Sequence, residues 1–138
     1  MTLVDTGPLV ALFDPRDGQH ECCVRVLRSV PGPLGTTVPV LTEAFHLLDP
    51  GSQGSAALRA FVSKGGLSVW WFEPSSLPRA FELMDRYADH PMDLADASLV
   101  VAAESLNTRK VFTLDRRDFR VYRVRRGHRE HAFEVIPK

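Results

Sequence analysis

The sequence predicts an α/β fold, a three-layer sandwich in which helices flank a central, mainly parallel sheet. Short apolar runs alternate with longer helical patterns along the chain, and strands separated by helices of ten or more residues are typical of parallel βαβ units. Between Leu94 and Ala103 only Asp96 and Ser98 are polar, which indicates a buried helix. The chain of 138 residues has the length of one domain, and we expect residues 1–138 to form a single one.

The first half of the chain contains the patterns of two short strands and four helices. We expect strands near residues 3–4 and 36–38, and helices over 9–13, 19–30, 39–48 and 56–62. Asp5 or Thr6 suits the cap of the first helix, and Pro8 suits its first turn. Proline and glycine at 31–33 end the second helix, and two glycines at 65–66 end the fourth.

The second half contains three strands and two longer helices. We expect a strand over 67–72, helices over 76–88 and 93–106, and strands over 110–114 and 133–136. In the first of these helices Phe81, Met84 and Tyr87 are expected to face inward. Trp70 and Trp71 are neighbours in a strand, so one is expected in the core and the other on a packing or dimer surface.

Composition excludes several classes of protein. Seventeen Lys and Arg residues balance seventeen Asp and Glu residues, so a uniformly basic nucleic-acid coat is excluded, although a polarised surface is not. No apolar run approaches the ~20 residues of a membrane span, and the start of the chain lacks the basic region of a signal peptide. Cys22 and Cys23 are adjacent and have the spacing of neither a structural disulfide nor a zinc site. We therefore expect a cytoplasmic protein without membrane contact.

Acidic residues follow the predicted strands at the points where the strands end. Asp5 follows the first strand directly, Glu43 lies about one turn into the next helix, and Asp115 follows a later strand. Asp93 and Asp96 are three residues apart in the first turn of the buried helix, so they point to one face. Because the carboxyl ends of parallel strands meet at one edge, we expect these acids to share a cleft. Such clustered carboxylates raise one another's pKa or require a cation, and oxygen ligands suit Mg²⁺ or Mn²⁺.

Each of these acids also has a structural interpretation. Asp5 and Asp93 precede helices and suit N-caps, Glu43 could pair with an arginine, and Asp118 could be a helix cap or a salt-bridge partner among nearby arginines. Asp96 is harder to explain in this way, because its neighbours in the helix are apolar. A buried carboxylate needs a partner or a metal.

Four segments in order resemble the PIN-domain ribonucleases, in particular the VapC-type toxins of bacterial toxin–antitoxin pairs. The segments are LVDTG at 3–7, Glu43, MDLADA at 92–97 and TLDRRDF at 113–119. Each segment alone is a weak signal, but their order and spacing along a chain of this length agree with the family. The resemblance spans nearly the whole chain.

The resemblance implies a PIN-like fold and a metal-dependent endoribonuclease that cuts RNA with a metal-activated water, leaving 3′-hydroxyl and 5′-phosphate ends. It places the catalytic and metal-binding acids at Asp5, Glu43, Asp96 and Asp115. Asp93 is implied as a further metal ligand and Asp118 as a ligand or a neighbour of the ligands, with the hydroxyls of Thr6 and Thr113 near the metal. The cofactor implied is Mg²⁺ or Mn²⁺, and the partners are RNA, a second copy of the chain and a small antitoxin that inserts a segment into the groove.

Basic residues are concentrated near the C-terminus. Nine of the seventeen Lys and Arg residues lie between Arg109 and Arg129, beginning at the last strand that carries an acid. We expect Arg116, Arg117, Arg120 and Arg126 to hold RNA phosphates beside the acidic cleft. A solvated, salt-bridged loop, or a surface for an acidic antitoxin segment, remains an alternative for this region.

Other residues in the C-terminal region have a simpler interpretation. Phe119, Tyr122 and Phe133 are expected to anchor the C-terminal segment to the sheet rather than to stack bases. The alternative function is a non-catalytic α/β module that binds nucleic acid or regulates. The phosphate-binding loop of P-loop enzymes, the G-x-G-x-x-G dinucleotide motif and the G-x-S-x-G nucleophile motif are all absent.

Overall fold

Five parallel strands form the centre of the protein in the order β3–β2–β1–β4–β7. The computed structural model describes all residues from Met1 to Lys138. The strands are β1 (Thr2–Val4), β2 (Leu34–Thr37), β3 (Ser68–Trp70), β4 (Lys110–Phe112) and β7 (Glu134–Ile136). The middle strand β1 pairs Leu3 with Gly35 of β2 and with Val111 of β4.

Helices connect successive strands of the sheet. The first half contains α1 (Thr6–Phe13), α2 (His20–Ser29), α3 (Val38–Leu47) and α4 (Gln53–Ser63). The second half contains the short helix η1 (Pro74–Ser76), then α5 (Leu77–Arg86), α6 (Leu94–Leu106) and α7 (Arg116–Val121). A separate antiparallel hairpin, β5 (Arg123–Arg126) and β6 (Arg129–Ala132), precedes β7.

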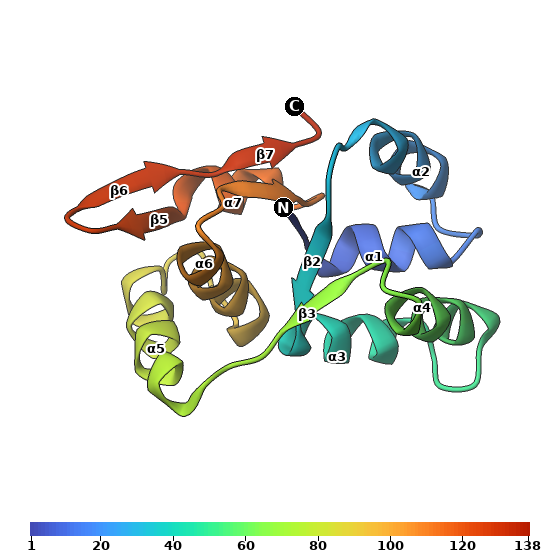
Figure 1. Ribbon diagram of the computed structural model, residues 1–138, viewed down its shortest axis with the longest axis horizontal. Helices are drawn as coiled ribbons and strands as arrows, with labels where there is room; N and C mark the ends of the chain where they lie inside the picture. The colour runs from blue at the N-terminus through green and yellow to red at the C-terminus, as the bar shows by residue number, and fades with distance from the viewer.

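The helices cover both faces of the sheet, as the α/β sandwich predicted from the sequence requires. Figure 1 shows α1 to α4 on one side of the strands and α5 and α6 on the other. This division follows from right-handed crossovers: the chain moves outward from β1 to β3 and then returns past β1 to β4. The predicted fold class, an α/β sandwich with a parallel sheet, is confirmed.

The core is centred on β1, β4 and α6. Leu3, Val111 and Phe112 are fully buried in the strands, and Leu99 and Val100 are fully buried in α6. The nearly continuous apolar sequence of this helix is explained because it packs on α5, α3, β2 and β5 at once. Its single buried hydroxyl, that of Ser98, bonds to the Ala95 carbonyl and to Thr37 Oγ1.

One inward position differs from those predicted. Phe81 of α5 is 52% exposed, because Ala80, Leu83 and Tyr87 form the buried stripe and Phe81 lies one position out of phase with it. Of the two cysteines in α2, Cys23 is buried and Cys22 is half-buried, and both thiols are free.

The region 115–132 contains elements that no sequence pattern indicated. It forms α7 and the hairpin β5–β6, with the turn at Gly127, whose φ is +58°. Both hairpin strands contain arginines, so the alternation of apolar and polar residues that marks a strand is weak. Val124 is the only buried residue in β5 and β6. None of the helices meets the length and hydrophobicity of a membrane-crossing segment.

Gly54 allows α4 to approach the end of α1. A Cβ atom at residue 54 would lie 2.5 Å from the Phe13 carbonyl oxygen and 3.1 Å from Leu48 Cδ2. We therefore expect Gly54→Ala to lower the free energy of unfolding by about 1–3 kcal/mol, despite the higher helix propensity of alanine. Urea denaturation measures this, with Gly18→Ala as the control because nothing lies within 4 Å of its Cβ. A Gly54→Ala variant as stable as the wild type would contradict this packing.

Candidate active site

A cleft of about 670 Å³ lies at the carboxyl edge of the sheet. Seven acidic residues line it: Asp5, Asp17, Glu43, Asp93, Asp96, Asp115 and Asp118. No lysine or arginine is among its lining residues, and His90 is the one basic side chain there. The structure therefore brings together all the acids singled out in the sequence, in a cleft that lacks a permanent positive charge.

Asp5 is the most buried of these acids, with 7% of its surface exposed. Its Oδ1 accepts a hydrogen bond from the Thr6 backbone N–H at 2.8 Å, and its Oδ2 accepts one from Thr113 Oγ1 at 2.8 Å. Burial raises the pKa of Asp5 to about 6 against the opposing effect of these two bonds, and the charges of Asp115 and Glu43 raise it further. Asp5 is thus both the N-cap of α1 and a residue of the cleft.

Asp93 and Asp96 enter the cleft from the first turn of α6. Asp93 is the N-cap, and its Oδ1 accepts a hydrogen bond from the Asp96 backbone N–H at 2.8 Å. Burial raises the pKa of Asp96 to about 8, and the negative charges of Asp5 and Asp93 add to the effect. Asp96 Oδ2 accepts a hydrogen bond from the Tyr122 hydroxyl at 3.1 Å. Burial, and then the Asp96 charge, raise the pKa of Tyr122, so the phenol stays protonated and acts as the hydrogen-bond donor to Asp96.

Asp115, Asp118 and Glu43 complete the acidic lining. Partial burial raises the pKa of Asp115, and the neighbouring charge of Asp118 raises it further. Asp118 Oδ1 lies 3.4 Å from His90 Nδ1, so its partner is a histidine rather than a nearby arginine. Glu43, on α3, is half-buried and forms no ion pair with an arginine.

The two threonines implied by the family resemblance are both buried in or beside the cleft. The Thr113 hydroxyl is used twice, since it donates to Asp5 Oδ2 and accepts from the Asp115 backbone N–H. Thr6 Oγ1 is buried without a hydrogen-bond partner, and Thr6 lines the cleft. A buried polar atom without a partner costs free energy, so this hydroxyl is suited to a bond with a bound ligand.

The chemistry of the cleft fits a divalent cation. Carboxylates that raise one another's pKa are stabilised by a cation among them, and the donor atoms here are the oxygens that Mg²⁺ and Mn²⁺ prefer. No three His, Cys, Asp or Glu side chains are already close enough to form a ready-made set of ligands. Binding of an ion would therefore draw side chains together, and it would also neutralise their mutual repulsion.

The four predicted RNA-binding arginines lie in two separate places. Arg116, Arg117 and Arg120 are on α7, which begins directly after Asp115. Arg126 is on the hairpin, and its Nη2 donates to the Asn107 carbonyl at the C-terminal end of α6. Asp93 caps the opposite end of the same 13-residue helix, so Arg126 is about 20 Å away along it. The structure does not bring Arg126 to the acidic cleft.

Three residues at or beside the cleft had no predicted role in it. Asp17 lies in the loop after helix α1, so a search for acids that directly follow strands does not find it. His90 stands three residues before Asp93, and that proximity was the available signal. Tyr122 was expected only to anchor the C-terminal segment, and it is fully buried as that role requires. The spacing between Tyr122 and Asp96 in the sequence does not indicate that the two side chains form a hydrogen bond.

The parallel sheet and the acid-lined cleft define an α/β protein with an acidic site at the carboxyl ends of its strands. A PIN domain model matches residues 2–125, and the chain belongs to the PIN-domain family. It is 28% identical over 137 residues to Ribonuclease VapC26 of Mycobacterium tuberculosis, covering 98% of this chain and 99% of that protein. This is a distant homology to the VapC ribonuclease toxins.

A solved structure supports the same fold. The crystal structure of VapC20 of Mycobacterium tuberculosis, described as a toxin that cleaves the sarcin–ricin loop, matches with a TM-score of 0.73. The match covers 80% of this chain and 87% of that chain at 21% sequence identity.

The raised carboxyl pKa values have a consequence for stability in metal-free protein. Because the native-state pKa of Asp96 is about 8, the native protein binds more protons than the unfolded chain between about pH 4 and 8, and stability falls as pH rises through that range. We expect Asp96→Asn to remove this loss. In urea denaturation with a chelator present, the variant should exceed the wild type by about 1 kcal/mol or more at pH 8 and match it near pH 4. A constant difference at every pH would contradict the assignment.

Proposed function

We propose that the chain is a metal-dependent endoribonuclease, the toxin of a type II toxin–antitoxin pair, and that residues 1–138 form one nuclease domain. The observation that carries the proposal is the cleft itself: seven acids line it and no lysine or arginine does. Membership of the PIN-domain family and the likeness to a VapC ribonuclease support the reaction class.

In this proposal Asp5, Glu43, Asp93, Asp96 and Asp115 hold Mg²⁺, or Mn²⁺ in its place. When bound, the divalent cation lowers the pKa of water and offsets the negative charge of the scissile phosphate. Asp5 is held by Thr6 and Thr113, so it presents its carboxylate without further ordering. The free hydroxyl of Thr6 is available to a water or phosphate oxygen, and Asp118 orients His90 at the wall of the cleft.

The proposed reaction is hydrolysis of an RNA phosphodiester. Water forms the new bond to phosphorus, the bond from phosphorus to the 3′-oxygen breaks, and that oxygen takes a proton. The products are a 3′-hydroxyl end and a 5′-phosphate end. The proton that the attacking water loses passes to solvent or to a cleft acid that does not hold the cation, such as Asp118.

The partners proposed are RNA, an antitoxin and a second copy of the chain, in the cytoplasm. Arg116, Arg117 and Arg120 follow the cleft residue Asp115 on α7 and would hold phosphates next to the scissile one. Arg126 would contact RNA farther along, on the hairpin. The side chain of Trp71 is 70% exposed and offers apolar surface for a dimer contact.

Loss of single carboxylates tests the catalytic proposal. We expect Asp5→Asn, Asp96→Asn and Asp115→Asn each to lower Mg²⁺-dependent RNA cleavage by about 100-fold or more while the protein stays folded, because each removes charge that holds the cation. Gel assays of cleaved RNA measure the rate, and circular dichroism checks the fold. Asp85→Asn is the control, since Asp85 is exposed on α5. A non-catalytic module would show no cleavage in the wild type, and wild-type rates in all three variants would refute the assigned roles.

The basic residues make a separate prediction about binding. We expect the double variant Arg117→Ala/Arg120→Ala to weaken RNA binding and to lower the slope of log affinity against log salt by roughly 1.4, since each phosphate contact in single-stranded RNA contributes roughly 0.7. Fluorescence anisotropy across a salt series measures both. The control is Arg28→Ala/Arg59→Ala, which removes the same charge from α2 and α4. Equal slopes in the two double variants would place the RNA elsewhere.

A further inference from the structure

The carboxylate of Asp96 has one hydrogen-bond donor in the whole structure, the Tyr122 hydroxyl. The bond runs from the phenol oxygen to Asp96 Oδ2 at 3.1 Å and joins the end of α7 to the first turn of α6. The charges around Asp96 are those of Asp5, Asp93 and Asp115, and all of them repel it. Tyr122 therefore supplies the only attractive polar contact that fixes this carboxylate within the protein.

The four acids implied as catalytic by the family resemblance, namely Asp5, Glu43, Asp96 and Asp115, divide into two pairs by how they are held. Asp5 accepts hydrogen bonds on both oxygens, from Thr6 and Thr113, and Asp96 accepts one from Tyr122. The side chains of Glu43 and Asp115 accept none from a backbone, hydroxyl or basic group. Asp5 and Asp96 are thus preorganised by hydrogen bonds, two at Asp5 and one at Asp96.

Tyr122 is itself rigidly placed. Its ring is fully buried and meets Tyr87 and Phe119 edge-on, with ring centroids 5.0 and 5.1 Å apart. Its carbonyl oxygen accepts a hydrogen bond from Arg123 Nη1 at 3.1 Å. A donor that cannot move fixes the torsion of the side chain that accepts from it.

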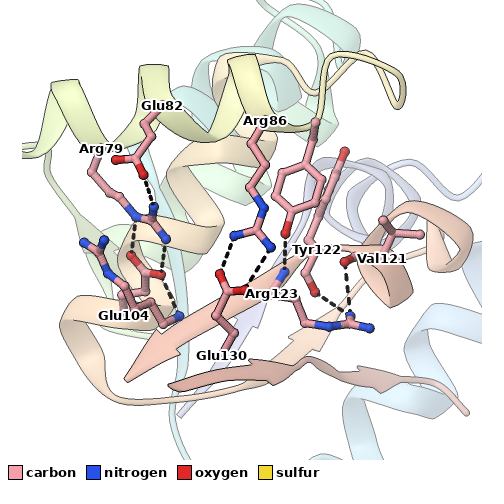
Figure 2. Close-up of polar contacts among 10 residues, drawn as sticks. Arg79, Glu82, Arg86, Glu104, Val121, Tyr122, Arg123 and Glu130 are labelled. Atoms are coloured by element: carbon pink, nitrogen blue, oxygen red, sulfur yellow. Dashed lines mark hydrogen bonds and ion pairs between the residues drawn. The ribbon is translucent and has the colours of Figure 1, made fainter. Parts of the chain in front are cut away.

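The hairpin and α5 brace this aromatic cluster from outside. Figure 2 shows Arg86 of α5 paired with Glu130 of β6. The Tyr87 hydroxyl accepts a hydrogen bond from the Arg123 backbone N–H at 3.1 Å. Arg79 binds Glu104 (Figure 2). Glu104 also accepts a hydrogen bond from the Arg125 backbone N–H. The Arg86–Glu130 and Arg79–Glu104 pairs and the Glu104–Arg125 bond tie the hairpin to α5 and α6, and they remain when the Tyr87 hydroxyl is removed. They therefore hold Tyr122, the residue that directly precedes the hairpin, without that hydroxyl.

We propose that Tyr122 is a positioning residue of the candidate active site, whose hydroxyl holds the Asp96 carboxylate in the orientation that binds the cation. The part of this proposal that concerns the cation rests on the proposed nuclease function. The part that concerns the orientation of Asp96 does not, and it can be measured without metal or RNA.

The chain offers a matched pair of variants for the test. Tyr122→Phe removes the hydroxyl that bonds to Asp96 and keeps the ring. Tyr87→Phe removes a hydroxyl from the adjoining ring of the same cluster, where the bond is to the Arg123 backbone and not to a cleft acid. Both variants lose a hydroxyl from a buried ring of the cluster, and only in Tyr122→Phe was that hydroxyl bonded to an acid of the cleft.

The first measurement is the side-chain rotamer of Asp96 in metal-free protein, from NMR couplings of its Cβ protons. We expect one rotamer in the wild type and in Tyr87→Phe, and averaging between rotamers in Tyr122→Phe. Averaging already present in the wild type, or a single unchanged rotamer in Tyr122→Phe, would overturn the positioning role, whether or not the protein is a nuclease.

The second measurement is Mn²⁺ affinity by calorimetry, together with kcat and KM for RNA cleavage. We expect Tyr122→Phe to weaken Mn²⁺ binding by about 10-fold or more and to lower kcat with little change in KM, because it disturbs a ligand and not the RNA contacts. Tyr87→Phe should stay within about 2-fold of the wild type, at a similar melting temperature. Equal losses in the two variants would mean that the hydroxyl acts on stability alone. A wild type that neither binds Mn²⁺ nor cleaves RNA would refute the proposed function and the cation-binding part, while the rotamer result would still decide the orientation.

Discussion

The carboxylate of Asp5 links the end of β1 to the residue that follows β4 at the centre of the sheet. One of its oxygens caps the start of α1, and the other accepts a hydrogen bond from Thr113, which lies 108 positions later and directly follows β4. The backbone repeats the connection, since the Asp5 N–H donates to the Phe112 carbonyl at 2.9 Å. This contact holds together the carboxyl ends of β1 and β4, from which Asp5 and Asp115 enter the cleft.

Burial of the Asp5 carboxylate is unfavourable for its charged form, and the same holds for Asp96. Asp5 and Asp96 hold their protons to about pH 6 and about pH 8 because burial and neighbouring acids disfavour ionisation. A cluster that weakens the metal-free fold at high pH is typical of a functional site rather than of a structural ion-pair network. Proton release and cation binding are then linked, so the affinity for a cation is expected to rise with pH.

Most of the architecture and the cleft were predictable because parallel sheets obey strict rules. Once strands were placed before Asp5 and Asp115, their carboxyl ends had to meet, and the apolar surroundings of Asp96 marked it as an unusual carboxylate. The phase of α5 was not predictable to one residue, so Phe81 was placed inside although it is exposed. The hairpin strands were not recognised because arginines fill positions where alternation would normally show apolar residues.

The location of Arg126 could have been predicted, and the role of Tyr122 could not. A strand at 134–136 that runs parallel to β4 must begin at the amino edge of the sheet, so the basic segment has to cross from the cleft to the opposite edge. That requirement alone separates Arg126 from Asp115. The bond between Tyr122 and Asp96, in contrast, joins the end of α7 to the first turn of α6, and no spacing in the sequence indicates that these two positions meet.

The central claim is that the acids of the cleft share a divalent cation. Crystals grown with Mn²⁺ and measured for anomalous scattering at the manganese edge test it most directly. The account predicts an anomalous peak in the cleft between Asp5 and Asp96, with carboxylate oxygens at about 2.0–2.2 Å, near the distances typical of small octahedral cations. A cleft without an anomalous peak at saturating Mn²⁺, or manganese bound only elsewhere on the protein, would contradict it.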